Sequence, residues 1–203
     1  FGDLRGIRAI DQGGRVEVLP YVTGGSTVRG NTDPANPFAD ALNLEGRIGA
    51  DFKMGVGPNL TLDATVTPDF GQVEVDPAVV NLSDREVIFP ERRPFFTEGS
   101  GLLNGPTTNY FHSRRIGAPP QGTASGDFVD FPRITTILGA AKLTGRLSSG
   151  TSVGVLGAVT GAEHAQTFDL ASGTFDEVRV APRTLYGLVR IQQEFGAAGS
   201  MAS

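Results

Sequence analysis

The sequence predicts an all-β protein built as an antiparallel up-and-down meander. Three observations support this fold class. Apolar and polar residues alternate with a period of two over several segments. Helical periodicity is nearly absent, because Gly or Pro interrupts most windows. Finally, the connections between the alternating segments are short and long in turn, as expected when successive strands run up and down.

Residues 44–54 give the clearest predicted strand. One set of alternate positions holds only apolar residues or Gly, and four of the five positions between them are charged. Successive side chains of a strand point to opposite faces of the sheet. The apolar face comprises Leu44, Gly46, Ile48, Ala50, Phe52 and Met54. We therefore expect a strand with one apolar face and one polar face.

The same period predicts five more strands, at about residues 14–22, 60–66, 134–147, 151–161 and 179–192. Pro20 restricts the first of them to a sheet edge or a bulge. In the strand at 134–147, the alternation puts Ile137 on the apolar face with Gly139 and Ala141. The apolar faces are rich in small residues, which suits a curved sheet.

The connections between these strands differ sharply in length. Residues 55–59 and 148–150 are short and contain the Gly, Pro, Asn and Ser residues of tight hairpins. The other connections, at 23–43, 67–133 and 162–178, are long. All short turns then lie at one end of the sheet, which is typical of outer-membrane β-barrels. The alternative is a soluble β-sandwich or small barrel with its apolar face inward.

The number of strands and the composition indicate what kind of protein this is and exclude several functions. A transmembrane barrel needs at least about eight strands, so the six predicted strands indicate an incomplete part of a barrel, with more strands in the full-length protein. The net charge of −5 argues against a nucleic-acid partner. Cysteine is absent, which excludes disulfides, thiolate metal sites and cysteine nucleophiles.

The densest motif in the chain lies between residues 59 and 117. It reads NLTLDATVTPDFGQVEVDPAVVNL at 59–82, FPERRPFFTEG at 89–99 and SRRIG at 113–117. It resembles a bacterial family of unknown function found as the C-terminal region of outer-membrane proteins, in many members after a family-9 carbohydrate-binding module. The resemblance covers about residues 44–147. It implies a β-barrel in the bacterial outer membrane, in contact with its lipid, and a carbohydrate-binding module upstream in the full-length protein; it supplies no activity.

Residues 67–133 are predicted to be a plug-like link inserted between two strands. Phenylalanines stand among balanced charges there, which indicates a folded segment. Its basic residues are arginines, whose planar fork suits partly buried pairs with carboxylates. The polar strand residues that could meet it are Glu45, Arg47, Asp51, Lys53 and Asp63. The candidates for structural ion pairs are Asp69, Glu74, Asp76, Arg85, Glu86, Glu91, Arg92, Arg93, Glu98, Arg114 and Arg115.

The function predicted from these observations is a non-enzymatic outer-membrane protein, acting as a pore, a receptor or a surface scaffold, with saccharide as a possible ligand. No catalytic residue, cofactor or metal site is predicted. Two alternatives stay open: a membrane-associated hydrolase that acts on glycans through carboxylates of residues 68–98, and a soluble β-sandwich module for adhesion or assembly. A calcium site at Asp69, Glu74 and Asp76 lacks the regular spacing of a calcium loop.

Overall fold

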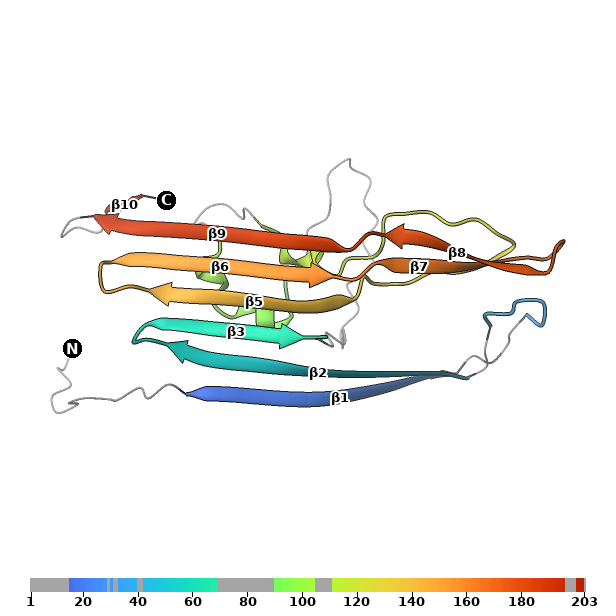
Figure 1. Cartoon of the computed structure of the whole chain (residues 1–203), viewed down its shortest axis with the longest axis horizontal. Helices are drawn as coiled ribbons and strands as arrows, with labels where there is room; N and C mark the ends of the chain where they lie inside the picture. The colour runs from blue at the N-terminus through green and yellow to red at the C-terminus, as the bar shows by residue number, and fades with distance from the viewer. Residues whose placement is uncertain are drawn as a thin grey trace.

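The computed structural model describes residues 15–28, 30, 33–39, 42–68, 90–104, 111–195 and 200–202. Within them the chain forms two antiparallel sheets (Figure 1). The larger sheet has the order β1-β2-β3-β5-β6-β9-β10, and the smaller one has the order β4-β7-β8. The prediction of an all-β antiparallel fold is therefore confirmed. The larger sheet is open in the part of the chain that is described, with β1 at one edge and β10 at the other, and no closed barrel is present there.

Five of the predicted strands correspond to single strands of the larger sheet: β1 (Val16–Val28), β2 (Leu42–Val56), β3 (Leu60–Val66), β5 (Ile137–Arg146) and β6 (Thr151–Thr160). β9 (Thr184–Phe195) and the short β10 (Ser200–Ala202) complete this sheet. Pro20 lies in β1, the edge strand, as predicted. Edge positions tolerate proline because no partner strand needs its missing N–H.

The prediction of a single strand at residues 179–192 was wrong, because these residues belong to two strands. β8 (Thr174–Ala181) ends before Pro182 and Arg183, and β9 begins after them. The predicted long link at 162–178 is largely the hairpin of β7 (Glu163–Asp169) and β8, and the link at 67–133 contains β4 (Phe128–Asp130). These strands escaped the pattern because their inward residues, such as Ala165 and Thr167, are small or polar.

The short connections lie together at one end of the larger sheet, as predicted. The turns at residues 57–59 and 147–150 are on the left in Figure 1, and the long connections are on the right. Gly57 and Gly150 have φ values of +65° and +82°, a left-handed conformation that glycine adopts without steric cost. We call the right-hand end the long-link end.

One face of the larger sheet is apolar across its long strands, and we call it the outer face. The strand register joins the apolar positions of neighbouring strands into continuous rows. One such row comprises Phe52, Ala64, Ala141, Gly157 and Gly187. This face stays open to its surroundings, since Ile48 is 72% exposed and Leu185 is 78% exposed.

The opposite, inner face is covered by part of the predicted plug-like link. Residues 90–104 and 111–117, here called the inner segment, form the short helix α1 (Pro94–Thr97) and two 3-10 turns, η1 (Ser100–Leu102) and η2 (Ser113–Arg115). In Figure 1 this segment, in green, lies behind the sheet. The main core forms between the two layers, where Phe96, Leu103 and Ile116 pack with inner-face residues of β5 and β6. Residues 69–89 and 105–110 lie outside the described residues.

A β-bulge reverses the predicted orientation of Ile137. The pairing of β5 with β6 shifts between Ile137 and Gly139, because Ile137 lies opposite Thr160 while Gly139 lies opposite Val159. Ile137 therefore belongs to the inner core and is 6% exposed, whereas Leu138 is 37% exposed. An extra residue in one strand changes which face the residues beyond it occupy.

Candidate functional site

A row of alternating charges crosses the inner face of the larger sheet. Lys53 of β2 lies opposite Asp63 of β3, and Asp63 lies opposite Lys142 of β5. The Asp63 carboxylate is 3.8 Å from Lys53 Nζ and 3.7 Å from Lys142 Nζ. Opposite charges on directly paired residues stabilise a sheet. Both lysines of the 203-residue chain are in this row.

Lys142 joins the sheet to the inner segment. Its side chain is 1% exposed, and its Nζ donates hydrogen bonds of 2.6 Å to the carbonyl oxygens of Phe95 and Glu98. Nζ also lies 4.9 Å from the centroid of the Phe95 ring. Carbonyl groups in the last turn of a helix lack partners within the helix, and here the lysine supplies one. A buried ammonium group is tolerated only with such compensation.

Lys53 makes a second and more exposed contact with the inner segment, because its Nζ pairs with the Glu98 carboxylate. The side chains of Lys53 and Glu98 are 40% and 57% exposed. The hydrogen bond from Lys53 lowers the pKa of the Glu98 carboxyl below its ordinary value, against a weaker opposing effect of burial. Solvent screens this pair far more than it screens Lys142.

Glu91 and Arg93 hold the two halves of the inner segment together. Arg93 Nε and Nη2 donate to the Glu91 carboxylate oxygens at 2.8 and 2.7 Å, and Ser113 Oγ donates to the same carboxylate. Arg93 also donates to the carbonyl oxygens of Ser113 and Ile116, each at 2.7 Å, and its guanidinium lies 4.2 Å from the centroid of the Phe96 ring. The fork of the guanidinium thereby ties residues 91–96 to residues 113–116.

These contacts set the charge state of Glu91. Burial alone would raise the pKa of its carboxyl, but the hydrogen bonds from Arg93 and Ser113, together with the Arg93 charge, lower it below its ordinary value. Glu91 is therefore a carboxylate that accepts hydrogen bonds at neutral pH.

The backbone of the inner segment lies directly on the sheet at Gly154 of β6. A Cβ atom at this position would be 2.5 Å from the carbonyl oxygen of Leu102. Arg190 Nη1, on the neighbouring strand β9, donates to the same oxygen at 3.4 Å. Only glycine allows so close an approach of two backbones.

The predicted ion-pair residues have different surroundings. Glu91 and Arg93 come together as a pair, and Glu98 pairs with the sheet. Arg114 donates to Pro90 O at 3.0 Å within the inner segment, and the carbonyl oxygen of Arg115 accepts a hydrogen bond from Tyr186 on the sheet. Arg92 is exposed, and its backbone N–H donates to Glu91. Asp69, Glu74, Asp76, Arg85 and Glu86 lie outside the described residues.

The sequence interpretation missed Lys142. Its signal was present, since a single lysine stands in the middle of an otherwise uncharged stretch from Ile137 to Gly145. The two carbonyl acceptors of Lys142 could not be foreseen, because both belong to the backbone more than forty residues away in the chain.

Two features are absent from the described residues. These residues contain no group of three or more His, Cys, Asp or Glu side chains placed to bind a metal ion. They also contain no helix with the length and apolar character needed to cross a membrane.

Comparison with known families places the chain in one of them. Residues 14–202 match a domain of unknown function, DUF5916. The chain belongs to this family. No curated protein and no solved structure matches it. The matched range includes the larger sheet and the inner segment together, so both are parts of the DUF5916 domain.

Proposed function

We propose that this DUF5916 domain is part of a non-enzymatic β-barrel in the bacterial outer membrane, and that its inner segment is a plug on the lumen side. One observation carries the proposal: the apolar outer face of the larger sheet is exposed, whereas the inner face, which carries the buried charges of Asp63 and Lys142, is covered. Water would favour the reverse arrangement. Lipid outside and a polar lumen inside favour the one observed.

Strand length supports a membrane-spanning sheet. A tilted strand of about 9–11 residues crosses the hydrocarbon core. β1, β2, β5, β6 and β9 contain 13, 15, 10, 10 and 12 residues. β3 is shorter, with 7 residues, and ends where the link leaves the sheet. In this orientation the short turns face the periplasm and the long-link end faces the cell exterior.

The open edges of the sheet fit a barrel that is completed by strands outside this chain. β1 offers a full-length edge, and β10 covers only a short stretch of β9. Unpaired strand edges promote aggregation unless they are covered or paired. A closed barrel needs at least about eight strands. In our proposal, further strands pair with both edges, and the ladder at β1 lacks the backbone N–H of Pro20.

The charge state of the described link carboxylates favours a structural plug over the hydrolase alternative. Glu91 and Glu98 each pair with a cation, which lowers the pKa of both carboxyls. A general acid in glycoside hydrolysis needs a raised pKa. The proposed barrel acts as a pore, a receptor or a surface scaffold. The family resemblance leads us to expect saccharide as its ligand.

The orientation in lipid is testable with single tryptophans, because the chain contains none. Val189→Trp places the reporter on the outer face of β9, at a side chain that is 66% exposed. Tyr186→Trp is the matched control on the inner face of the same strand, where Tyr186 packs against the core. In vesicles of brominated phospholipid, the full-length protein should show strong quenching of the first reporter and weak quenching of the second. Equal quenching of the two would contradict the assignment of the faces.

The plug role is testable with valine in place of two glycines on opposite faces. Gly154→Val forces Leu102 and its neighbours away from the sheet, whereas a Cβ at Gly187 meets no atom within 4 Å. Gly154→Val should speed trypsin cleavage at Arg92 and Arg115 and raise the conductance of the full-length barrel in a planar bilayer. Gly187→Val should change neither property. If Gly154→Val speeds cleavage at these arginines and leaves the conductance unchanged, the inner segment is not a plug.

A further inference from the structure

The larger sheet divides at the long-link end, because β3 is shorter than the strands around it. Its last residue, Val66, pairs with Ala50 on one side and with Gly139 on the other. Beyond these pairs β2 continues for eight residues towards Leu42, and β1 is the one described strand that pairs with it there. Figure 1 shows the resulting separation between β2 and β5 to the right of β3.

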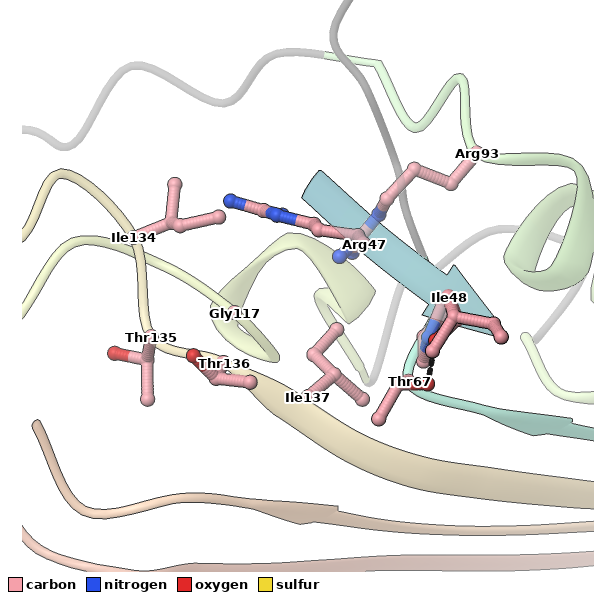
Figure 2. Close-up of a pocket in the computed structure, with 10 residues that line it drawn as sticks. Arg47, Ile48, Thr67, Arg93, Gly117, Ile134, Thr135, Thr136 and Ile137 are labelled. Atoms are coloured by element: carbon pink, nitrogen blue, oxygen red, sulfur yellow. Dashed lines mark hydrogen bonds between the residues drawn. The ribbon is translucent and has the colours of Figure 1, made fainter. Parts of the chain in front are cut away.

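The described residues leave a cavity of about 290 Å³ at this division (Figure 2). Arg47 and Ile48 of β2 line one side of it, and residues 134–137 at the start of β5 line the other. The link leaves the sheet beside this cavity at Thr67 and returns beside it at Gly117. Both residues have positive φ values, 42° and 83°, so the chain turns sharply at each.

The β5 side of the cavity is fixed to the hairpin of β7 and β8. The backbone N–H of Thr136 donates to Glu163 Oε1 at 2.6 Å, and the N–H of Gly161 donates to the Thr136 carbonyl oxygen at 2.8 Å. Glu163 is the first residue of β7. A displacement of the hairpin would therefore displace this wall of the cavity.

The β2 side continues into an ordered pair of turns at residues 33–39. The Asp33 and Asn36 side chains each accept a hydrogen bond from the backbone N–H two residues ahead, from Ala35 at 2.9 Å and Phe38 at 3.0 Å. Each of these two side chains precedes a proline, which fixes the backbone further. The turns hold Phe38 in a defined position four residues before β2 begins.

The two sides meet again through aromatic rings. The Phe38 ring contacts the Phe175 ring of β8 edge-on, with centroids 5.8 Å apart and planes at 80°. Phe175 also packs on Phe168 of β7, at 4.8 Å. We propose that Phe38, Phe168 and Phe175 form an aromatic strap that ties the two sides of the divided sheet and controls how far the cavity opens. Phe175 is 61% exposed. The strap therefore buries little apolar area and can open reversibly.

Hydrogen exchange in the full-length protein tests whether the strap couples the two sides. Phe175→Ala should accelerate exchange of the amides of Asn36, Phe38 and Ala39 by roughly 2- to 10-fold, the range for loss of an aromatic pair. Leu170→Ala is the control, since Leu170 lies in the same hairpin and is 53% exposed. It should leave these amides unchanged. Unchanged exchange in Phe175→Ala would overturn the proposal.

Access to the cavity provides a second readout. The chain has no cysteine, so Thr135→Cys gives a single thiol on the cavity wall. A maleimide should label this thiol several-fold faster when Phe175→Ala is added and at the original rate when Leu170→Ala is added. Equal rates with both additions would show that the rings do not control the cavity. Neither readout depends on a membrane, so the strap and the proposed barrel can fail separately.

Discussion

The outer face of the larger sheet carries Leu, Val and Ile side chains that stay exposed, whereas the inner face carries Lys, Asp and Thr side chains that are buried. Lys142 is 1% exposed and Thr65 is 2% exposed, while Val189 on the opposite face is 66% exposed. The difference teaches that hydrophobicity alone does not decide burial in this fold. The inner segment supplies carbonyl and carboxylate partners for the lysines, and the apolar face fits a surrounding that is itself apolar.

The largest expected effect comes from Lys142→Met, which keeps much of the side-chain volume but removes the ammonium group. The carbonyl oxygens of Phe95 and Glu98 would lose their donor, and Asp63 would lose one of its two cations. We expect the free energy of unfolding to fall by about 3–5 kcal/mol, as when a buried charged pair is broken. Urea titration of the folded protein measures this change.

Lys53→Met is the matched control for the buried lysine. The Lys53 side chain is 40% exposed. The free energy of unfolding should therefore fall by less than about 1 kcal/mol, and this decrease should become smaller as salt is added. Equal losses for the two lysines would show that Lys142 is not the anchor of the inner segment.

A charge on the outer face should have the next largest effect. Val189→Arg should cost about 2–4 kcal/mol in a bilayer if the side chain lies near its midplane. The same change at a water-exposed position would cost at most about 0.5 kcal/mol. Folding titrations into phospholipid vesicles distinguish these values, with Val189→Leu as the apolar control. A cost as small for arginine as for leucine would mean that lipid does not cover this face.

The smallest of the three effects on stability is expected at Glu91, which pairs with Arg93 within the inner segment. This effect depends on pH. Glu91→Gln should lower the free energy of unfolding by about 2 kcal/mol at neutral pH, because hydrogen bonds to charged partners are weakened. Since folding lowers the pKa of this carboxyl, the stabilisation is complete above the ordinary carboxyl pKa and is lost as the pH falls through the lowered value.

Urea titrations across the acidic range should therefore show the wild type and the Glu91→Gln variant converging at low pH. Ser113→Ala removes one neutral donor to the same carboxylate and should cost about 1 kcal/mol. A stability difference between the wild type and the Glu91→Gln variant that stayed constant with pH would contradict the assigned charge state.

Several features were predictable from the residues, and each miss has a local cause. The alternation of residues 44–54 identified both faces of β2, and the Gly-rich turns placed the short connections at one end. Ile137 was assigned to the wrong face, because a bulge inserts one residue and period-two counting cannot detect it. The strand at 179–192 was assigned as one piece, although Pro182 stands within it.

The sequence alone determined the strand period, the two faces of β2 and the positions of tight turns, because these depend on neighbouring residues and on the two-residue repeat of a strand. It also showed that the link carries arginines and phenylalanines suited to a folded segment. The tertiary structure alone decided which face of the sheet the link covers and which groups it contacts. Lys142 meets the carbonyl oxygens of Phe95 and Glu98, and Phe38 meets Phe175, across separations that no local pattern encodes. Such contacts form only when the whole sheet brings distant strands and links together.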